Sequence, residues 1–266
     1  MAKVWLQASP PHLFKFPPSP YPDVLPSPQA PISFAQPFRI DPKLYRDALD
    51  VRVPLTIATV YAVTVTLLNA VNRQRGHKPW AISKTRLFFA LVIAHNVFLA
   101  VYSTWTHIGV IRTILDIWPG WHGMKSLPAV VDAFCKMQGP RGLGDGIEYN
   151  SHSSQWTVAN PSIKLLNNKP DPTDIGRLWN GGLAYYGWLF YISKFYEVID
   201  TLVILAKGKR SSVLQTYHHA GAMLCMWAGV RYMSSPIMLF CLYNSGIHSL
   251  MVSSSFPFFL ETWRIN

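Results

Sequence analysis

The stretch SKFYEVIDT, residues 193–201, places three charged side chains inside an otherwise apolar run of the chain. Lys194, Glu197, Asp200 and Thr201 stand at i, i+3, i+6 and i+7, which is one stripe along a helix. Each charge at the centre of a membrane helix costs roughly 2.5–3.5 kcal/mol on insertion scales. We therefore expect the stripe to face protein or a polar chamber. A structural ion-pair network of Lys194 with Glu197 and Asp200 is the alternative.

The composition of the whole chain is that of a membrane protein. Of its 266 residues 50% are hydrophobic and 14% are charged, against about 25% charged in a typical soluble protein. The net charge of +11 would suggest nucleic acid in a soluble chain. Here the basic residues fall largely in short loops beside apolar segments, so no nucleic-acid partner is expected. Cys135, Cys225 and Cys241 show neither metal spacing nor a disulfide framework.

Five apolar segments are long enough to cross a bilayer, because about 20 residues of helix span roughly 30 Å of hydrocarbon. Helices are expected, since backbone polar groups in lipid must be bonded within their own segment. The predicted spans are residues 53–71, 87–105, 183–206, 212–232 and 236–260. Residues 108–118, shorter and amphipathic, are predicted to lie at the membrane interface. The predicted fold is all-α, a polytopic transmembrane helix bundle with five spans.

The remaining segments are irregular or polar. Residues 1–50 form a proline-rich N-terminal arm, because proline removes hydrogen-bond donors and blocks helix. Residues 119–180 are a long connection rich in Gly, Pro and Asn, which we expect to be exposed or functional. The basic loops after the first and third spans should be cytosolic. The N-terminus is then lumenal and the C-terminus cytosolic.

The fourth and fifth predicted spans also carry polar stripes. Gln215, His218 and His219 stand at i, i+3 and i+4, and Asn244 and His248 at i, i+4. If the three stripes converge, they line one chamber. Zinc bound by the three histidines is disfavoured, because adjacent residues on a helix point about 100° apart. A neutral histidine can act as nucleophile or base near pH 7, and an amide one turn earlier can orient it or stabilise an oxyanion.

Three motifs in this order resemble the ELO family of very-long-chain fatty acid elongases. They are KFYEVIDT at 194–201, LQTYHHAGAM at 214–223 and NSGIHSLM at 244–251. The family pattern is K-x-x-E-x-x-D-T, then H-x-x-H-H, then N-x-x-x-H-x-x-M-Y. The likeness is to the fungal branch and runs from about residue 50 to Met251, so residues 51–251 are predicted to be an ELO-type transmembrane domain. The family has seven spans, which makes this domain incomplete.

The resemblance implies an endoplasmic-reticulum acyltransferase, a very-long-chain 3-oxoacyl-CoA synthase. It condenses acyl-CoA with malonyl-CoA to 3-oxoacyl-CoA, CO2 and CoA, without a metal or redox cofactor. His218 would take the acyl group as an acyl-imidazole, and His248 would serve the malonyl half as base or second carrier. The residues expected to organise or support the chamber are Lys194, Glu197, Asp200, Thr201, Tyr217 and His219. Expected partners are the bilayer, other enzymes of the elongation cycle or a second copy of the chain.

Two further positions carry predictions about the substrates. Gln215 stands where many family members have histidine, so we expect it to supply a hydrogen bond rather than a proton or a metal ligand. Lys207, Lys209 and Arg210 are predicted to meet the CoA phosphates. A plain topological signal is the alternative reading of those three cations.

The likeness stops abruptly at Met251, where VSSSFPFFLETWRIN follows in place of a tyrosine-rich run. Val252 and Ser253 can be encoded by the consensus start of an intron, and three serines followed by Pro257 make a poor helix. We therefore expect residues 252–266 to be an artefact or a splice variant, and the chain to be inactive. A non-enzymatic membrane protein, either a transporter or a structural subunit with a polar chamber, is the alternative function.

Overall fold

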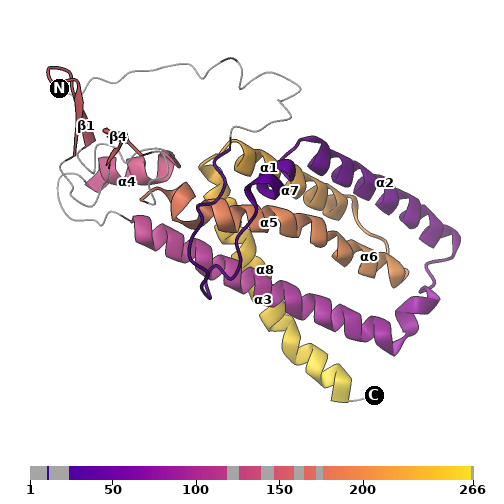
Figure 1. Ribbon diagram of the computed structural model, residues 1–266. Coiled ribbons are helices and arrows are strands. Elements are labelled where there is room, and N and C mark those ends of the chain that lie inside the picture. Colours follow the sequence, from indigo (N-terminus) through magenta and orange to yellow (C-terminus); the bar gives the residue numbers. More distant parts are fainter. Residues whose placement is uncertain are drawn as a thin grey trace.

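A computed structural model describes residue 11 and residues 24–118, 126–138, 147–158, 165–171 and 176–264. The chain is mostly helical, and its long helices lie side by side in an elongated bundle (Figure 1). The helices are α1 Pro42–Asp47, α2 Arg52–Gln74, α3 Arg86–Ile117, α4 Ser126–Cys135, α5 Ala184–Tyr196, α6 Val198–Ala206, α7 Val213–Arg231 and α8 Pro236–Arg264. Two shorter helical turns are η2 Ala81–Lys84 and η4 Trp179–Leu183.

Two helices agree with the predicted membrane character of the chain, while the number of spans stays a prediction. Among the described residues, two helices are long and apolar enough to cross a membrane, α2 and α3. The helices α5 to α8 cover the other three predicted segments. α3 has 32 residues and is therefore about 48 Å long.

The predicted separate helix at residues 108–118 is wrong, because α3 continues through it to Ile117, and its location at the membrane interface stays a prediction. Gly109 is no helix breaker here. It lies directly against the ring of Tyr186, where a Cβ would have no room. The close approach of α3 to α5, which carries Tyr186, therefore explains a glycine inside a long helix.

The predicted span at residues 183–206 is two helices that meet at Glu197. The amide of Asp200 donates to the carbonyl of Glu197 at 3.1 Å, three residues back instead of four. Such a tight turn marks the end of α5 and the start of α6. The break lies inside the charged stripe.

The N-terminal arm contains a helix that the sequence analysis missed. Asp41 caps α1, because its side chain accepts hydrogen bonds from the amides of Lys43 and Leu44 at 2.8 and 2.9 Å. Pro42 occupies the first turn of α1, where proline is tolerated. Tyr45 of this helix is completely buried, so the arm is part of the fold.

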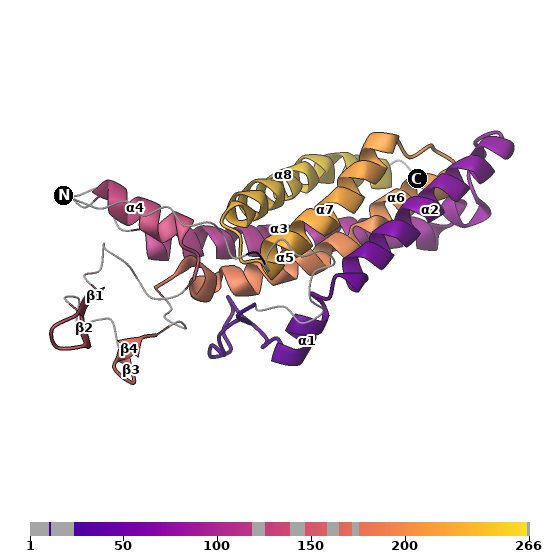
Figure 2. The same cartoon turned by 90° about the horizontal axis from the view of Figure 1, so that it is seen from above.

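The prediction of an all-α fold needs a correction in the long connection, which holds two antiparallel hairpins. β1 Ile147–Asn150 pairs with β2 Gln155–Val158, and β3 Leu165–Leu166 pairs with β4 Lys169–Pro170. The amides of His152 and Ser153 donate to the side chain of Asn150, which closes the first turn. Both hairpins lie beyond one end of the bundle (Figure 2).

The backbone after Met251 is helical to Arg264, contrary to the expected poor helix. A proline within a long helix can kink it without ending it. The origin of residues 252–266 as an artefact or splice variant stays a prediction.

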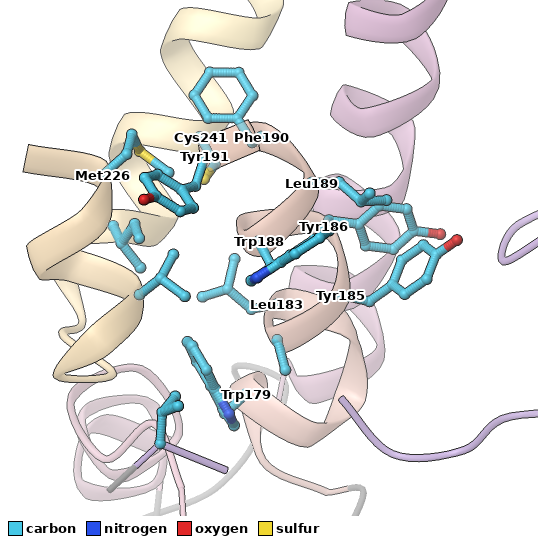
Figure 3. Close-up of a cluster of buried hydrophobic side chains, with 14 of the residues drawn as sticks. Trp179, Leu183, Tyr185, Tyr186, Trp188, Leu189, Phe190, Tyr191, Met226 and Cys241 are labelled. Carbon is cyan, nitrogen blue, oxygen red and sulfur yellow. The ribbon is translucent and has the colours of Figure 1, made fainter. Parts of the chain in front are cut away.

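The core is built around α5, whose residues 184–191 are all buried (Figure 3). A helix buried on every side must have neighbours all round, and α5 packs against α3, α7 and α8. The N-terminal arm covers the remaining side. There the hydroxyl of Tyr45 donates to the carbonyl of Ala184 at 2.9 Å, and Trp227 and Arg231 of α7 donate to the carbonyl of Leu49 at 2.8 Å.

Candidate functional site

Lys194 is the charged centre of the site. It lies in the last turn of α5 and is 1% exposed. Its Nζ donates to Oε1 of Glu197 at 2.6 Å and to Oδ1 of Asn244, on α8, at 2.7 Å. The same Nζ lies 3.8 Å from the centre of the Phe190 ring. An ion pair with a shared amide therefore joins the polar stripes of α5 and α8.

Glu197, at the break between α5 and α6, connects this centre to His248. Its Oε1 also accepts a hydrogen bond from Oγ of Ser193 at 3.3 Å. Its Oε2 lies 3.9 Å from Nε2 of His248, one turn beyond Asn244 on α8. This separation exceeds hydrogen-bond length, so Glu197 acts on His248 through its charge.

Asp200 pairs with a residue that the sequence analysis did not assign to the site. Nε2 of His95, on α3, lies 2.8 Å from Oδ1 of Asp200, and Nδ1 of His95 lies 3.0 Å from the hydroxyl of Tyr196. His95 is buried, as an intramembrane histidine with two partners should be. A histidine inside an apolar span was the one signal available in the sequence, but spacing along α3 cannot identify a partner on α6.

Thr201 joins α6 to α2 and α7. It is completely buried, and its hydroxyl lies 2.9 Å from the hydroxyl of Tyr61 on α2. Nε2 of Gln215 donates to the same threonine oxygen at 3.4 Å, and Oε1 of Gln215 accepts from Oγ of Ser211 at 3.4 Å. Both ends of the Gln215 amide are thus held by hydroxyl groups. Tyr61 was also missed, since an isolated tyrosine in an apolar helix has no distinctive spacing.

The two adjacent histidines of α7 lie on different faces. His219 is buried, with its ring 6.1 Å from that of Tyr61, centre to centre. His218 is exposed, and its ring centre lies 5.6 Å from that of His219. His248 is close enough to His218 for their charges to interact. Tyr217 is 75% exposed on the outer surface of α7, so the structure does not bring it into this group.

The charges of the stripe act on both α7 and α8. Lys194, Glu197 and Asp200 each interact electrostatically with His219 and with His248. The predicted stripes therefore converge, with Tyr217 outside them. Within the described parts of the chain, no group of three or more His, Cys, Asp or Glu side chains is arranged to hold a metal ion. That the site needs no metal stays a prediction.

The basic loop after α6 lies at the end of the bundle away from the hairpins (Figure 1). Lys207, Lys209 and Arg210 are all exposed. Between them Gly208 has a φ of +74°, and its carbonyl lies 3.2 Å from Nδ1 of His77 in the loop between α2 and α3. The two basic loops are therefore packed on one another at the same end of the bundle.

Comparison with known proteins agrees with this arrangement of motifs. The family model described as ELO, the GNS1/SUR4 family, matches residues 48–256. This match covers all the site residues described above. No solved structure matches the chain.

Several curated relatives are named as fatty acid elongases. One from Dictyostelium discoideum is 33% identical over 115 residues, which are 39% of this chain and 45% of the relative. Fatty acid elongase 2 of Trypanosoma brucei brucei is 27% identical over 78 residues, 29% of each chain. Very long chain fatty acid elongase 7 of Rattus norvegicus is 34% identical over 67 residues, 24% of each chain. The chain spans less than half the length of the curated relatives it matches.

Proposed function

The chain belongs to the ELO family, and on that premise we propose that it catalyses the condensing step of fatty acid elongation. The inactivity expected from residues 252–266 is the competing outcome, and the assay below decides between the two. Acyl-CoA and malonyl-CoA give 3-oxoacyl-CoA, CO2 and CoA, so the chain is a very-long-chain 3-oxoacyl-CoA synthase. The observation that carries the proposal is the ion pair of Lys194 and Glu197, which joins Asn244 and approaches His248. A role in fatty acid elongation follows from the family and the relatives, and the reaction itself is our proposal.

The first half-reaction is acyl transfer to His218. A ring nitrogen of neutral His218 attacks the thioester carbonyl, the carbon–sulfur bond breaks, and CoA leaves as the thiolate and takes up a proton. The exposure of His218 leaves its ring open to the substrate. Gln215, one turn earlier and held at both ends of its amide, orients this part of α7.

The second half-reaction is a decarboxylative condensation. The bond from the malonyl group to its carboxylate breaks and releases CO2, and its electron pair forms the enolate of the CoA thioester. The enolate carbon attacks the acyl carbonyl, and the bond to His218 breaks to restore the neutral imidazole. The oxygen of Asn244 is fixed by Lys194, so its amide NH2 group is oriented to donate to the enolate oxygen. His248 stands beside Asn244 on α8 as the base or second carrier for the malonyl half.

The surroundings of this reaction form part of the proposal. The exposed cations Lys207, Lys209 and Arg210 suit the CoA phosphates. We propose the endoplasmic-reticulum membrane as its location, with a lumenal N-terminus and a cytosolic C-terminus. Acyl-CoA and malonyl-CoA are then substrates rather than cofactors. Other enzymes of the elongation cycle, or a second copy of the chain, are the proposed protein partners.

The two half-reactions can be measured separately with the whole chain in proteoliposomes. Incubation with acyl-CoA alone should release CoA and add one acyl group to the protein, as seen by intact-mass spectrometry. Labelled malonyl-CoA should then yield labelled 3-oxoacyl-CoA. His218→Ala should lose the acyl adduct, and Asn244→Ala should keep the adduct while condensation falls about 10²–10³-fold.

A histidine outside the site provides the matched control. His152 lies in the turn of the first hairpin and is exposed, so His152→Ala should retain both half-reactions. The assignment fails if His218→Ala keeps the acyl adduct. If the unaltered chain makes neither adduct nor product, while the folded protein is shown to be present in the membrane, the proposed reaction is wrong for this chain.

A further inference from the structure

A second, apolar site lies between α2, α3 and α6, at the end of the bundle that carries the basic loops. It is a groove of about 370 Å³, within the range of roughly 300–1,000 Å³ for small-molecule sites. Its walls include Leu68 of α2, Val92 of α3 and Leu202 of α6. Figure 1 shows α2 and α3 on either side of α6 at this end. Both flanking helices are apolar enough to span a membrane, so the groove is within reach of lipid.

Hydrogen bonds hold the floor of the groove in place. Trp80 lines it, and its amide donates to the carbonyl of Ala206 at 3.0 Å while its indole N–H donates to Asn72 at 2.7 Å. Asn72 is completely buried and donates in turn to the carbonyl of Leu205 at 2.8 Å. A floor fixed by three hydrogen bonds does not collapse into the groove. The groove is therefore a lasting feature of this fold.

The rim of the groove is basic. Lys84 and Arg86 are exposed and lie between the lining residues Ile82 and Phe88, and Lys207 directly follows the lining residue Ala206. The guanidinium of Arg75 lies 5.3 Å from the centre of the Trp80 ring. From Val51 to Leu115 and from Thr201 to Leu260 the sequence contains no Asp or Glu. The carboxylate nearest the groove along α6 is Asp200, which is paired with His95 at 2.8 Å.

We propose that this groove binds an acyl chain of an anionic phospholipid, with the headgroup held by Lys84 and Arg86. An apolar groove between membrane helices fits the chain, and a rim of exposed cations fits a negative headgroup. A substrate chain in this groove would not reach the condensing site, because α7 and α8, which carry His218 and His248, contribute no wall. The groove shares His95, the partner of Asp200, with the candidate site, but His218 and His248 lie outside its walls.

The lipid site can be tested by native mass spectrometry of the whole chain purified in detergent. The probes are phosphatidylserine and phosphatidylcholine with identical acyl chains. We expect one phosphatidylserine to be retained in preference to phosphatidylcholine. A cation near a membrane surface contributes about 1 kcal/mol to anionic-lipid binding, so Lys84→Gln with Arg86→Gln should reduce the preference about 30-fold. Leu202→Trp, which fills the groove, should prevent retention of either lipid.

Two control variants make the same kinds of substitution at positions outside the groove. Arg112→Gln removes an exposed cation from the other end of α3, about 39 Å away, and should leave the preference unchanged. Leu67→Trp adds the same bulk on α2 at a 61% exposed position that does not line the groove, and should leave retention unchanged.

Three results would overturn the proposal. The first is equal retention of both lipids that the charge variants do not alter, which is the behaviour of general annular lipid. The second is undiminished phosphatidylserine binding in Leu202→Trp that folds as the unaltered chain does. The third is one-for-one displacement of the lipid by acyl-CoA, which would make the groove a substrate site.

Discussion

The ion pair of Lys194 and Glu197 allows a quantitative test of how the bundle is held together. Lys194→Met removes the ammonium and leaves Glu197, with a side chain 6% exposed, to Ser193 and the more distant His248. Glu197→Gln leaves the buried ammonium to Asn244 and the Phe190 ring. Each single change leaves a buried charge without its ion-pair partner, which typically lowers the free energy of unfolding by about 3–5 kcal/mol.

The double variant Lys194→Met/Glu197→Gln leaves no unpaired charge of this pair in the core. It should lose far less stability than the sum of the losses in the two single variants. We expect a coupling free energy of about 2 kcal/mol or more between the two positions, within the range for residues that share one network. On the scale for large domains, about 2–4 °C per kcal/mol, each single variant should lose roughly 6–20 °C in melting temperature. The double variant should recover a large part of that loss.

The measurement is thermal unfolding of the detergent-solubilised chain, followed by tryptophan fluorescence. The exposed pair Lys43–Asp47 of α1 is the matched control, because its side chains are 81% and 59% exposed and the same cycle there should show no measurable coupling. The reasoning is refuted if the two costs at Lys194 and Glu197 simply add. It is also refuted if Lys194→Met melts with the unaltered chain.

Two further changes test other parts of the fold. Gly208 has a φ of +74°, and a Cβ added there would lie 2.5 Å from the carbonyl oxygen of His77, so Gly208→Ala should separate the two basic loops and speed their cleavage by trypsin. Gly76 has a φ of +64° with open space around it, so Gly76→Ala adds only the backbone strain of a positive φ and should have a smaller effect. Burial raises the pKa of Tyr45 well above its usual value, so the stability it contributes is complete below about pH 10 and is lost as the pH rises further. Tyr45→Phe should lower the free energy of unfolding by about 0.5–1.5 kcal/mol at neutral pH, because the hydrogen bond to the carbonyl of Ala184 is lost. The melting temperature of this variant should fall less at alkaline pH than that of the unaltered chain, and an equal fall in both proteins would contradict the reasoning.

The sequence predicted the long helices well because apolar length alone requires them in lipid. It could not predict the break at Glu197, since no glycine or proline lies beside Glu197 to mark a helix end. The capping of α1 was readable in principle, as Asp41 followed by Pro42 is a helix start. The proline-rich surroundings hid that signal.

Spacing along one helix identified the charged stripe but not its partners. The alternative network of Lys194 with both acids holds for Glu197 only, because Asp200 pairs with His95 of α3. The turn at Glu197 separates the two acids between two helices. A partner on another helix depends on tertiary packing, which leaves no periodic trace in the sequence. The same reason explains why Tyr61, the partner of Thr201, was missed.

The two adjacent histidines of α7 show how the fold divides roles that the sequence leaves together. Successive residues of a helix point about 100° apart, so the pair can place one ring in the core and the other at the surface, and only one of the two is buried. That one is His219, beside Tyr61. An acyl acceptor must let a thioester carbonyl approach its nitrogen to about 3–3.5 Å, which a packed ring prevents. Exposed His218, next to buried His219 and within the electrostatic reach of His248, meets that requirement.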